Sequence, residues 1–414
     1  MFRKWEFDLY IKYLSYFNVI VLSYVNLLKD TIDIGLIRGI VLFLLAAYFF
    51  AMRRVSSKTF NYLMYFSLYI LIMGIITFVR YNFFPDKVLK VFLGSISFAY
   101  GIFFINNWER FVELNRVFII SILIVIVTIA LANITGVNYK LYAETGLSLG
   151  GQGVNIAKNL TIFIMPFPIF LLLFNKKKGL MLALRILYIV CLLIIIISLK
   201  RGAMVGLLLG TLAYFIISVK RGRFIRNSML VIIAAFLAYP FYEPILQKTF
   251  EARAENFSLE EKDIETEGRY QEYKMTFDDI KNKSFVRTIF GEGVQSEAEY
   301  FNINRFHHTD FFSILFGAGV IGLILYILTY WVAYTEVRYF RRLELQYPIV
   351  RELRAVCYAL IFSIVGLSIS GVYHTIDLRG FAYLYIGGCL GLMRSFLVDF
   401  LQKARIDGKV GIRG

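Results

Sequence analysis

The sequence predicts an all-α polytopic membrane protein with about twelve transmembrane helices and one long extracytoplasmic loop. Its 414 residues are 58% hydrophobic and 18% charged, whereas water-soluble domains are about half apolar and a quarter charged. The mean hydropathy of +0.65 points the same way. The net charge is +16, but the basic residues cluster in short runs between apolar segments, as in polytopic membrane proteins. The charge therefore indicates membrane topology, and we expect no nucleic-acid partner.

Apolar runs long enough to cross a hydrocarbon layer of about 30 Å as helices recur along the chain. They divide it into predicted spans one to nine within residues 1–246, a polar loop at 247–310, and three further spans with a cytoplasmic tail at 311–414. The predicted spans lie near 11–28, 34–52, 60–79, 88–105, 117–133, 159–174, 179–198, 202–218, 229–246, 311–334, 355–373 and 381–398.

The basic loops set the predicted orientation. With the N-terminus in the cytoplasm, alternate loops carry basic runs such as Arg53-Arg54 and Lys176-Lys177-Lys178, and the C-terminus is cytoplasmic too. The short outer loops are poor in Lys and Arg, except for Lys200-Arg201. Because topology disfavours a positive pair there, we expect that pair to have a chemical role.

Further cations lie near the outer ends of predicted spans. Taken singly, each of them is typical of a side chain that anchors a helix to lipid headgroups. Taken together, they predict an outward-facing cationic cavity that binds an anion. The set comprises Arg38, Arg80, Lys87, Lys90, Lys200, Arg201 and Arg379.

The loop at 247–310 has the composition of a soluble segment. Tyr270, Tyr273, Phe277 and Ile280 recur at spacings of three and four, which predicts one apolar stripe on a helix. Such a helix would lie on the bilayer surface or cap the bundle. Arg269 opens it, where a cation is disfavoured by the helix dipole, and this placement hints at a partner anion; Tyr270 could also stack on a sugar face.

Two histidines directly precede the tenth predicted span. His307, His308 and Asp310, with His374 from another outer loop, could in principle bind a metal. Adjacent histidines seldom converge on one ion, however, so we expect no metal. A histidine with an ordinary pKa near 6.5 is better suited to proton transfer with an acceptor hydroxyl.

Several motifs in order resemble the O-antigen ligase and polymerase family. They are Ser198-Leu199-Lys200-Arg201-Gly202-Ala203 at the start of a span, Gly268-Arg269 followed by Phe290-Gly291-Glu292-Gly293, and His308-Thr309-Asp310-Phe311-Phe312 followed by Gly319 and Gly322. They cover roughly residues 195–335 in detail. Two positions depart from the family pattern: Thr309 stands where the family usually has Asn, and Lys200 replaces a small residue.

The resemblance implies a GT-C-like glycosyltransferase in a bacterial cytoplasmic membrane. It implies a glycan donor on undecaprenyl diphosphate, used at the outer face of the membrane without a nucleotide sugar. The cationic residues would offset the leaving-group charge without a metal or cofactor, and attack opposite the leaving group, with the histidine as base, would invert the anomeric centre. Arg201, Arg269 and His308 would be the catalytic residues. Membrane lipids, a chain-length regulator and a flippase of the same pathway are the implied partners. The substrate-binding candidates are Lys200, Arg38, Arg379, Arg80, His307 and Tyr270.

The acceptor separates the two activities of the family. A polymerase would extend another lipid-linked repeat unit, whereas a ligase would transfer the glycan to lipid A-core. The sequence His308-Thr309-Asp310-Phe311-Phe312 and its glycine-spaced span resemble the polymerases slightly better than the ligases, so we expect a polymerase. From another class, a transporter or lipid-glycan flippase would show two comparable halves and ionisable residues at the bilayer midplane, and neither is evident in this sequence.

Overall fold

A computed structural model describes residues 56–83, 87–135, 160–197, 201–218, 268–301, 309–370 and 376–406. These residues form helices and connecting turns, without a strand among them. The helices are α4 (Lys58–Tyr81), α5 (Lys87–Phe104), α6 (Trp108–Thr135), α8 (Phe167–Leu173), α9 (Lys178–Ile197), α10 (Arg201–Ser218), α12 (Gly268–Asn282), α13 (Phe285–Phe290), α14 (Glu297–Phe301), α15 (Asp310–Tyr339), the short 3₁₀ helix η5 (Phe340–Leu343), α16 (Pro348–Ser370) and α17 (Ile376–Ile406).

The helical membrane architecture is confirmed for the part of the chain that the structure describes. Six of its helices are long and apolar enough to cross a membrane, and three shorter apolar helices accompany them. The predicted spans at 11–28, 34–52 and 229–246 lie outside the described residues, so the count of twelve stays a prediction. Every other predicted span overlaps a helix.

Two helices begin earlier than the apolar runs predict. The Asn107 side chain accepts the Arg110 N–H at 2.9 Å, which satisfies a free donor in the first turn of α6. Pro348 begins α16, where its missing N–H costs no hydrogen bond. Local capping therefore sets these boundaries, and hydropathy alone does not.

Glycines allow the closest helix contacts in the bundle. A Cβ on Gly101 of α5 would lie 2.4 Å from the Leu384 carbonyl oxygen of α17, and a Cβ on Gly387 would lie 2.3 Å from the Phe98 carbonyl oxygen. Small residues commonly bring helix backbones together in membranes, where apolar burial gives little drive for association. Gly206 of α10 packs on α16 in the same way, and its carbonyl accepts the Ser363 hydroxyl at 2.8 Å.

Contacts between helices fix which helix ends share one end of the bundle. α15 runs antiparallel to α4 and to α16, α10 runs antiparallel to α16, and α17 runs parallel to α5. For α4 and α15, the contacts are Tyr69 with Ala318 and Thr59 with Glu336; for α15 and α16, they are Tyr326 with Ser368 and Arg354 with Val337. For α10 and α16, they are Gly206 with Ser363 and Ser218 with Glu352. For α5 and α17, they are Gly94 with Tyr383 and Ile105 with Gly391.

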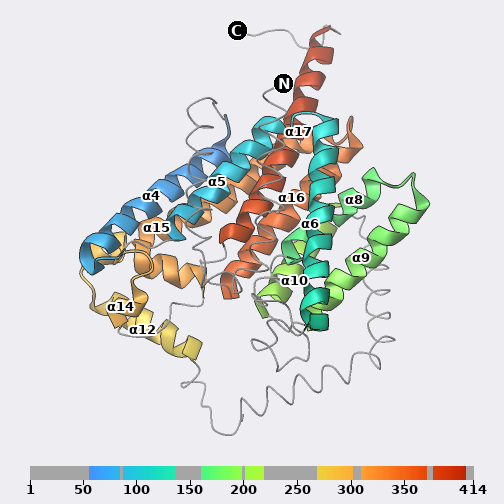
Figure 1. The fold of residues 1–414 in the computed structure, drawn as a ribbon. Helices are drawn as coiled ribbons and strands as arrows, with labels where there is room; N and C mark the ends of the chain where they lie inside the picture. The colour runs from blue at the N-terminus through green and yellow to red at the C-terminus, as the bar shows by residue number, and fades with distance from the viewer. Residues whose placement is uncertain are drawn as a thin grey trace.

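The end of α4 and the starts of α10, α15 and α17 therefore lie together, and we call this the loop end. α12 and α14 lie there, whereas the C-terminal part of α17 projects from the opposite end (Figure 1). The basic residues Arg338, Arg341 and Arg342 lie at that opposite end, as the division of charges along the sequence predicts. An ion pair between Arg394 and Glu336, whose side chains meet at 2.6 Å, lies at the same end.

Candidate functional site

α15 is broken at Gly319, close to the loop end. Gly319 has φ 64° and ψ −168°, a conformation that only glycine adopts without strain. In a continuous helix, the N–H groups of residues 320 and 321 would bond to the carbonyls of Phe316 and Gly317. The break therefore leaves both carbonyls free to accept bonds from elsewhere.

The turn Gly291–Gly293 supplies those bonds. The Glu292 N–H donates to the Phe316 carbonyl at 3.1 Å, and the Gly293 N–H donates to the Gly317 carbonyl at 2.9 Å. Gly291 and Gly293 both have positive φ, and a Cβ on Gly291 would lie 2.4 Å from the Gly317 oxygen. The sequence predicts a tight turn here, and the structure confirms it and shows that its glycines permit backbone-to-backbone contact with α15.

Tyr69 of α4 holds both sides of this contact. Its hydroxyl lies 3.0 Å from the Ala318 carbonyl oxygen and 3.2 Å from the Phe290 carbonyl oxygen, so one proton is shared between two acceptors. Thr77, two turns further along α4, donates to the Val294 carbonyl at 2.9 Å. The segment on either side of the turn is thus tied to α4 as well as to α15.

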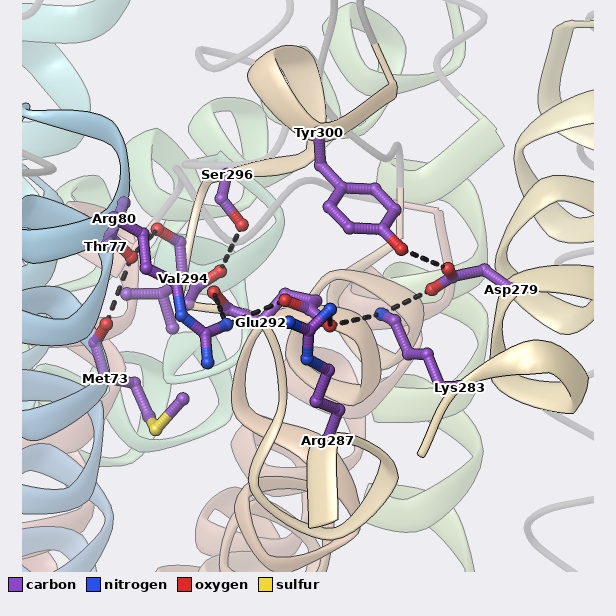
Figure 2. Close-up of polar contacts among 11 residues, drawn as sticks. Met73, Thr77, Arg80, Asp279, Lys283, Arg287, Glu292, Val294, Ser296 and Tyr300 are labelled. Carbon is purple, nitrogen blue, oxygen red and sulfur yellow. Dashed lines mark hydrogen bonds and ion pairs between the residues drawn. The ribbon is translucent and has the colours of Figure 1, made fainter. Parts of the chain in front are cut away.

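The Glu292 side chain is a buried carboxylate at the centre of the turn. It is 2% exposed, and its Oε2 lies 2.7 Å from Nη1 of Arg80. Its Oε1 lies 3.6 Å from both Lys283 and Arg287 (Figure 2). A buried carboxylate needs opposite charge and hydrogen bonds to offset its lost hydration. Cations from α4, from the α12–α13 connection and from α13 supply the charge here.

Lys283 connects this carboxylate to a second one. Its ammonium group pairs with Asp279 one turn earlier and lies 4.1 Å from the centre of the Phe316 ring. The Tyr300 hydroxyl donates to Asp279 at 2.6 Å. Burial raises the pKa of Tyr300, and its hydrogen bond to the Asp279 carboxylate raises that pKa further, so Tyr300 stays a proton donor at neutral pH.

The first turn of α15 is anchored separately. Thr309 caps the helix by accepting the Phe312 N–H at 3.4 Å, so a hydroxyl fills the place of the family's usual amide. Asp310 is fully buried, and its Oδ2 accepts the Tyr326 hydroxyl at 3.1 Å. Tyr326 in turn lies 2.7 Å from the Ser368 hydroxyl of α16. These contacts fix the two residues that directly follow His308.

α12 caps the bundle at α15. Tyr273 stacks on Phe312 with ring centres 4.5 Å apart, and Phe277 meets the same ring edge-on at 5.4 Å. The structure confirms that these two members of the predicted apolar stripe share one face.

The structure places the predicted site residues to different extents. Arg201 is the first residue of α10, Arg269 and Tyr270 lie in the first turn of α12, and Arg379 lies in the first turn of α17, all at the loop end. Their side chains are outside what the structure describes, as are Lys200, Arg38, His307 and His308 altogether. The described candidate is Arg80, which is 37% exposed and bonded through Nη1 to the carboxylate and the carbonyl of Glu292.

Sequence reasoning missed the cluster around Glu292. The only local signal was a carboxylate between two turn glycines, and it did not indicate that the carboxylate is buried. A hollow of about 370 Å³ lies beside the cluster, and its lining is Asp279, Asn282, Lys283, Ser284, Arg287 and Tyr300. Within the described ranges, no three His, Cys, Asp or Glu residues are grouped as metal ligands would be; the histidines fall outside those ranges.

Comparison with known protein families finds a match for one segment of the chain. Residues 186–327 match the O-antigen ligase family. The match includes Arg201, Arg269, His308, the Gly291–Gly293 turn and the α15 break, and it confirms the resemblance seen in the sequence motifs. A search among curated proteins finds no match.

Proposed function

We propose that this chain, which carries a segment of the O-antigen ligase family, is an O-antigen polymerase. It transfers a glycan from undecaprenyl diphosphate to a lipid-linked repeat unit at the outer face of the bacterial cytoplasmic membrane. One observation carries the proposal: the three candidate catalytic residues fall within the matched segment, at or next to helix ends of the loop end. There the 268–301 segment is bonded to α4 and α15.

Two arginines bind the departing diphosphate in this proposal. Guanidinium groups of Arg201 and Arg269 form paired hydrogen bonds with phosphate oxygens and offset the charge that develops on the leaving group. Each contact contributes about 3–4 kcal/mol in the transition state, by analogy with oxyanion donors. Lys200, Arg38 and Arg379 add weaker contacts, and Tyr270 and His307 contact the glycan.

His308 acts on the acceptor. It accepts the proton of the acceptor hydroxyl while that oxygen attacks the anomeric carbon from the side opposite the diphosphate. The bond between the anomeric carbon and the diphosphate oxygen breaks, its electron pair leaves with the diphosphate, and the anomeric centre is inverted. The start of α15 supports this role because Thr309 and Asp310, which directly follow His308 in the sequence, are held by hydrogen bonds.

Arg80 has a structural role in this proposal, although its position in the sequence predicts that it binds the substrate. Its Nη1 is engaged by Glu292, so a phosphate would meet only its other N–H groups. The geometry favours Arg80 as one of the residues, with Tyr69 and Thr77, that bind the 268–301 segment to α4. In that role it supports the site by fixing α12, which carries Arg269.

A ligase is the second candidate, and the description of the matched family favours it. Disruption of the gene, followed by gel analysis of surface polysaccharide, distinguishes the two. A polymerase defect leaves lipid A-core capped with a single repeat unit, whereas a ligase defect leaves long chains on the carrier lipid. Unchanged surface polysaccharide would contradict both activities.

A further inference from the structure

The chain between α12 and α14 turns back along α4, away from the loop end. The Val294 carbonyl is bonded to Thr77, four residues before the end of α4. The Phe290 carbonyl is bonded to Tyr69, twelve residues before that end. At 1.5 Å per residue, Tyr69, whose hydroxyl bonds Phe290, lies about 18 Å back along the helix axis. Even a tilt of 40°, the upper end for membrane helices, leaves about 14 Å along the membrane normal between the level of Tyr69 and the end of α4.

α15 gives an independent measure of this depth. Gly291 and Gly293 pack on residues 317–319, seven to nine residues after α15 begins at Asp310. That is about 10–13 Å from the start of the helix. In Figure 2, Arg287 of α13 lies below Glu292, at about the height of Met73, whereas Ser296 lies above Glu292. Both neighbouring helices therefore place α13 at the level of membrane-spanning residues.

The backbone of this segment meets the requirement for irregular structure at that depth. Non-helical backbone is tolerated within the hydrocarbon region only where protein satisfies its polar groups. The Gly291 N–H donates to the Arg287 carbonyl at 2.7 Å, and the next two N–H groups donate to α15. Tyr69 satisfies the Phe290 carbonyl. The return from α13 is thus bonded to protein at each of these groups.

α13 is two-sided. Phe285, Val286, Ile289 and Phe290 share one face by their spacing, and Phe285 and Val286 are 78% and 63% exposed. The opposite side carries Arg287, which turns to Glu292 and the polar hollow. On α4, side chains such as Ile72 and Ile75, within two turns of Tyr69, are also exposed and apolar. The described part of α4 at this level therefore also exposes apolar side chains, as expected of a helix surface that meets lipid.

We propose that α13 is a re-entrant helix whose face formed by Phe285, Val286 and Phe290 contacts the acyl chains of the bilayer. α13 then forms a wall between the hydrocarbon and the polar hollow at Asn282, Ser284 and Arg287. The occupant is bilayer lipid because the face lies at the depth of α4's apolar surface and carries no charge. The proposal depends on bonding depth and exposure, and it holds whether or not the chain is a transferase.

Spin-label accessibility tests the proposal in purified protein reconstituted as single copies in nanodiscs of phosphatidylethanolamine and phosphatidylglycerol. A label is attached at Val286→Cys, with Ile72→Cys as the lipid control and Lys281→Cys, at the exposed end of α12, as the aqueous control. Cys191, Cys357 and Cys389 are replaced by Ala. If that background does not fold, the native cysteines are kept, because all three are buried.

Collisions with oxygen and with a nickel chelate distinguish the possible surroundings of position 286. We expect high oxygen and low nickel accessibility, so that the logarithm of their ratio is positive as at position 72 and opposite in sign to that at position 281. High nickel accessibility would overturn the proposal, because α13 would then face water. Low accessibility to both reagents would overturn it too, because protein would then cover the face.

Discussion

The Arg80 guanidinium lies 2.7 Å from the Glu292 carboxylate across 212 residues of sequence. This ion pair joins the last turn of α4 to the turn that caps the broken helix α15. Lys283 and Arg287 reach the same carboxylate, so one buried side chain holds α4, α13 and the α12–α13 connection in place. We call Glu292 with Arg80, Lys283 and Arg287 the clamp. In the proposed transferase, the clamp does not contact the substrate but fixes the segment that carries Arg269.

Glu292→Gln should therefore loosen the loop end and reduce turnover. The amide removes the carboxylate that three cations share, and among the described residues Asp279 replaces it only for Lys283. We expect a loss of about 1–3 kcal/mol of stability, less than for a fully buried pair because Arg80 and Arg287 stay partly hydrated. Thermal unfolding in detergent and product formation in membranes measure the two effects.

Glu299→Gln is the matched control, because Glu299 is exposed on α14 and makes no ion pair with the described residues. It should leave both measurements unchanged. A double-mutant cycle with Arg80→Gln then isolates the pair, since contacting residues give non-additive effects. Additive losses would show that Arg80 and Glu292 do not act together.

Gly319→Ala should destabilise the protein by at least about 1–3 kcal/mol. The cost arises because φ 64° with ψ −168° is strained for any side chain, and because a Cβ would lie 2.2 Å from the Ile289 carbonyl oxygen. Gly179→Ala in α9 is the control, since a Cβ there meets nothing within 4 Å. Equal melting temperatures for the two variants would show that α15 can run unbroken.

Local features of this fold could be predicted from the sequence. The Gly291–Gly293 turn and the stripe of Tyr273 and Phe277 follow from residue types and spacings within a few positions. Apolar runs likewise located the helices, because each span must present a hydrocarbon-compatible surface by itself. Capping shifted some of the boundaries, as at Pro348.

The clamp could not be predicted, because it depends on contacts between distant segments. Arg80 lies in a last helical turn, where an anchor to headgroups explains it equally well, and nothing near Glu292 indicates its burial. Gly319 is a similar case: glycine is frequent in membrane helices, and only the approach of residues 289–293 shows that this one breaks the helix. The roles of Arg201, Arg269 and His308 rest on family resemblance and stay predictions.

Arg201→Lys should lower turnover about 10²–10³-fold while the protein still inserts in the membrane. Lysine keeps the positive charge but loses the planar pair of donors that matches phosphate oxygens. Product formation from purified lipid-linked donor, normalised to the amount of protein in the membrane, measures the effect. Near-normal turnover would remove Arg201 from the mechanism.

His308→Ala should reduce turnover about 10²–10⁴-fold, the range expected for loss of a general base. His307→Ala should have a much smaller effect, because only His308 has the family's distance to Gly319. The two variants are matched in residue type and in neighbouring position, so a folding defect would affect both. The reverse ranking would show that the histidines have been assigned in the wrong register.

Chelation tests whether arginines suffice to offset the leaving-group charge. Diphosphate departure commonly relies on a divalent ion, but here two guanidinium groups in a partly dehydrated site would supply comparable stabilisation. We therefore expect unchanged turnover in EDTA when purified protein and purified lipid-linked donor are used, so that no metal-dependent step of donor synthesis contributes. A Mg²⁺-dependent enzyme assayed in the same buffer confirms that chelation is complete. Activity lost in EDTA and restored by a divalent ion would instead place a metal at His307, His308, Asp310 and His374. The arginines would then share the diphosphate with that ion.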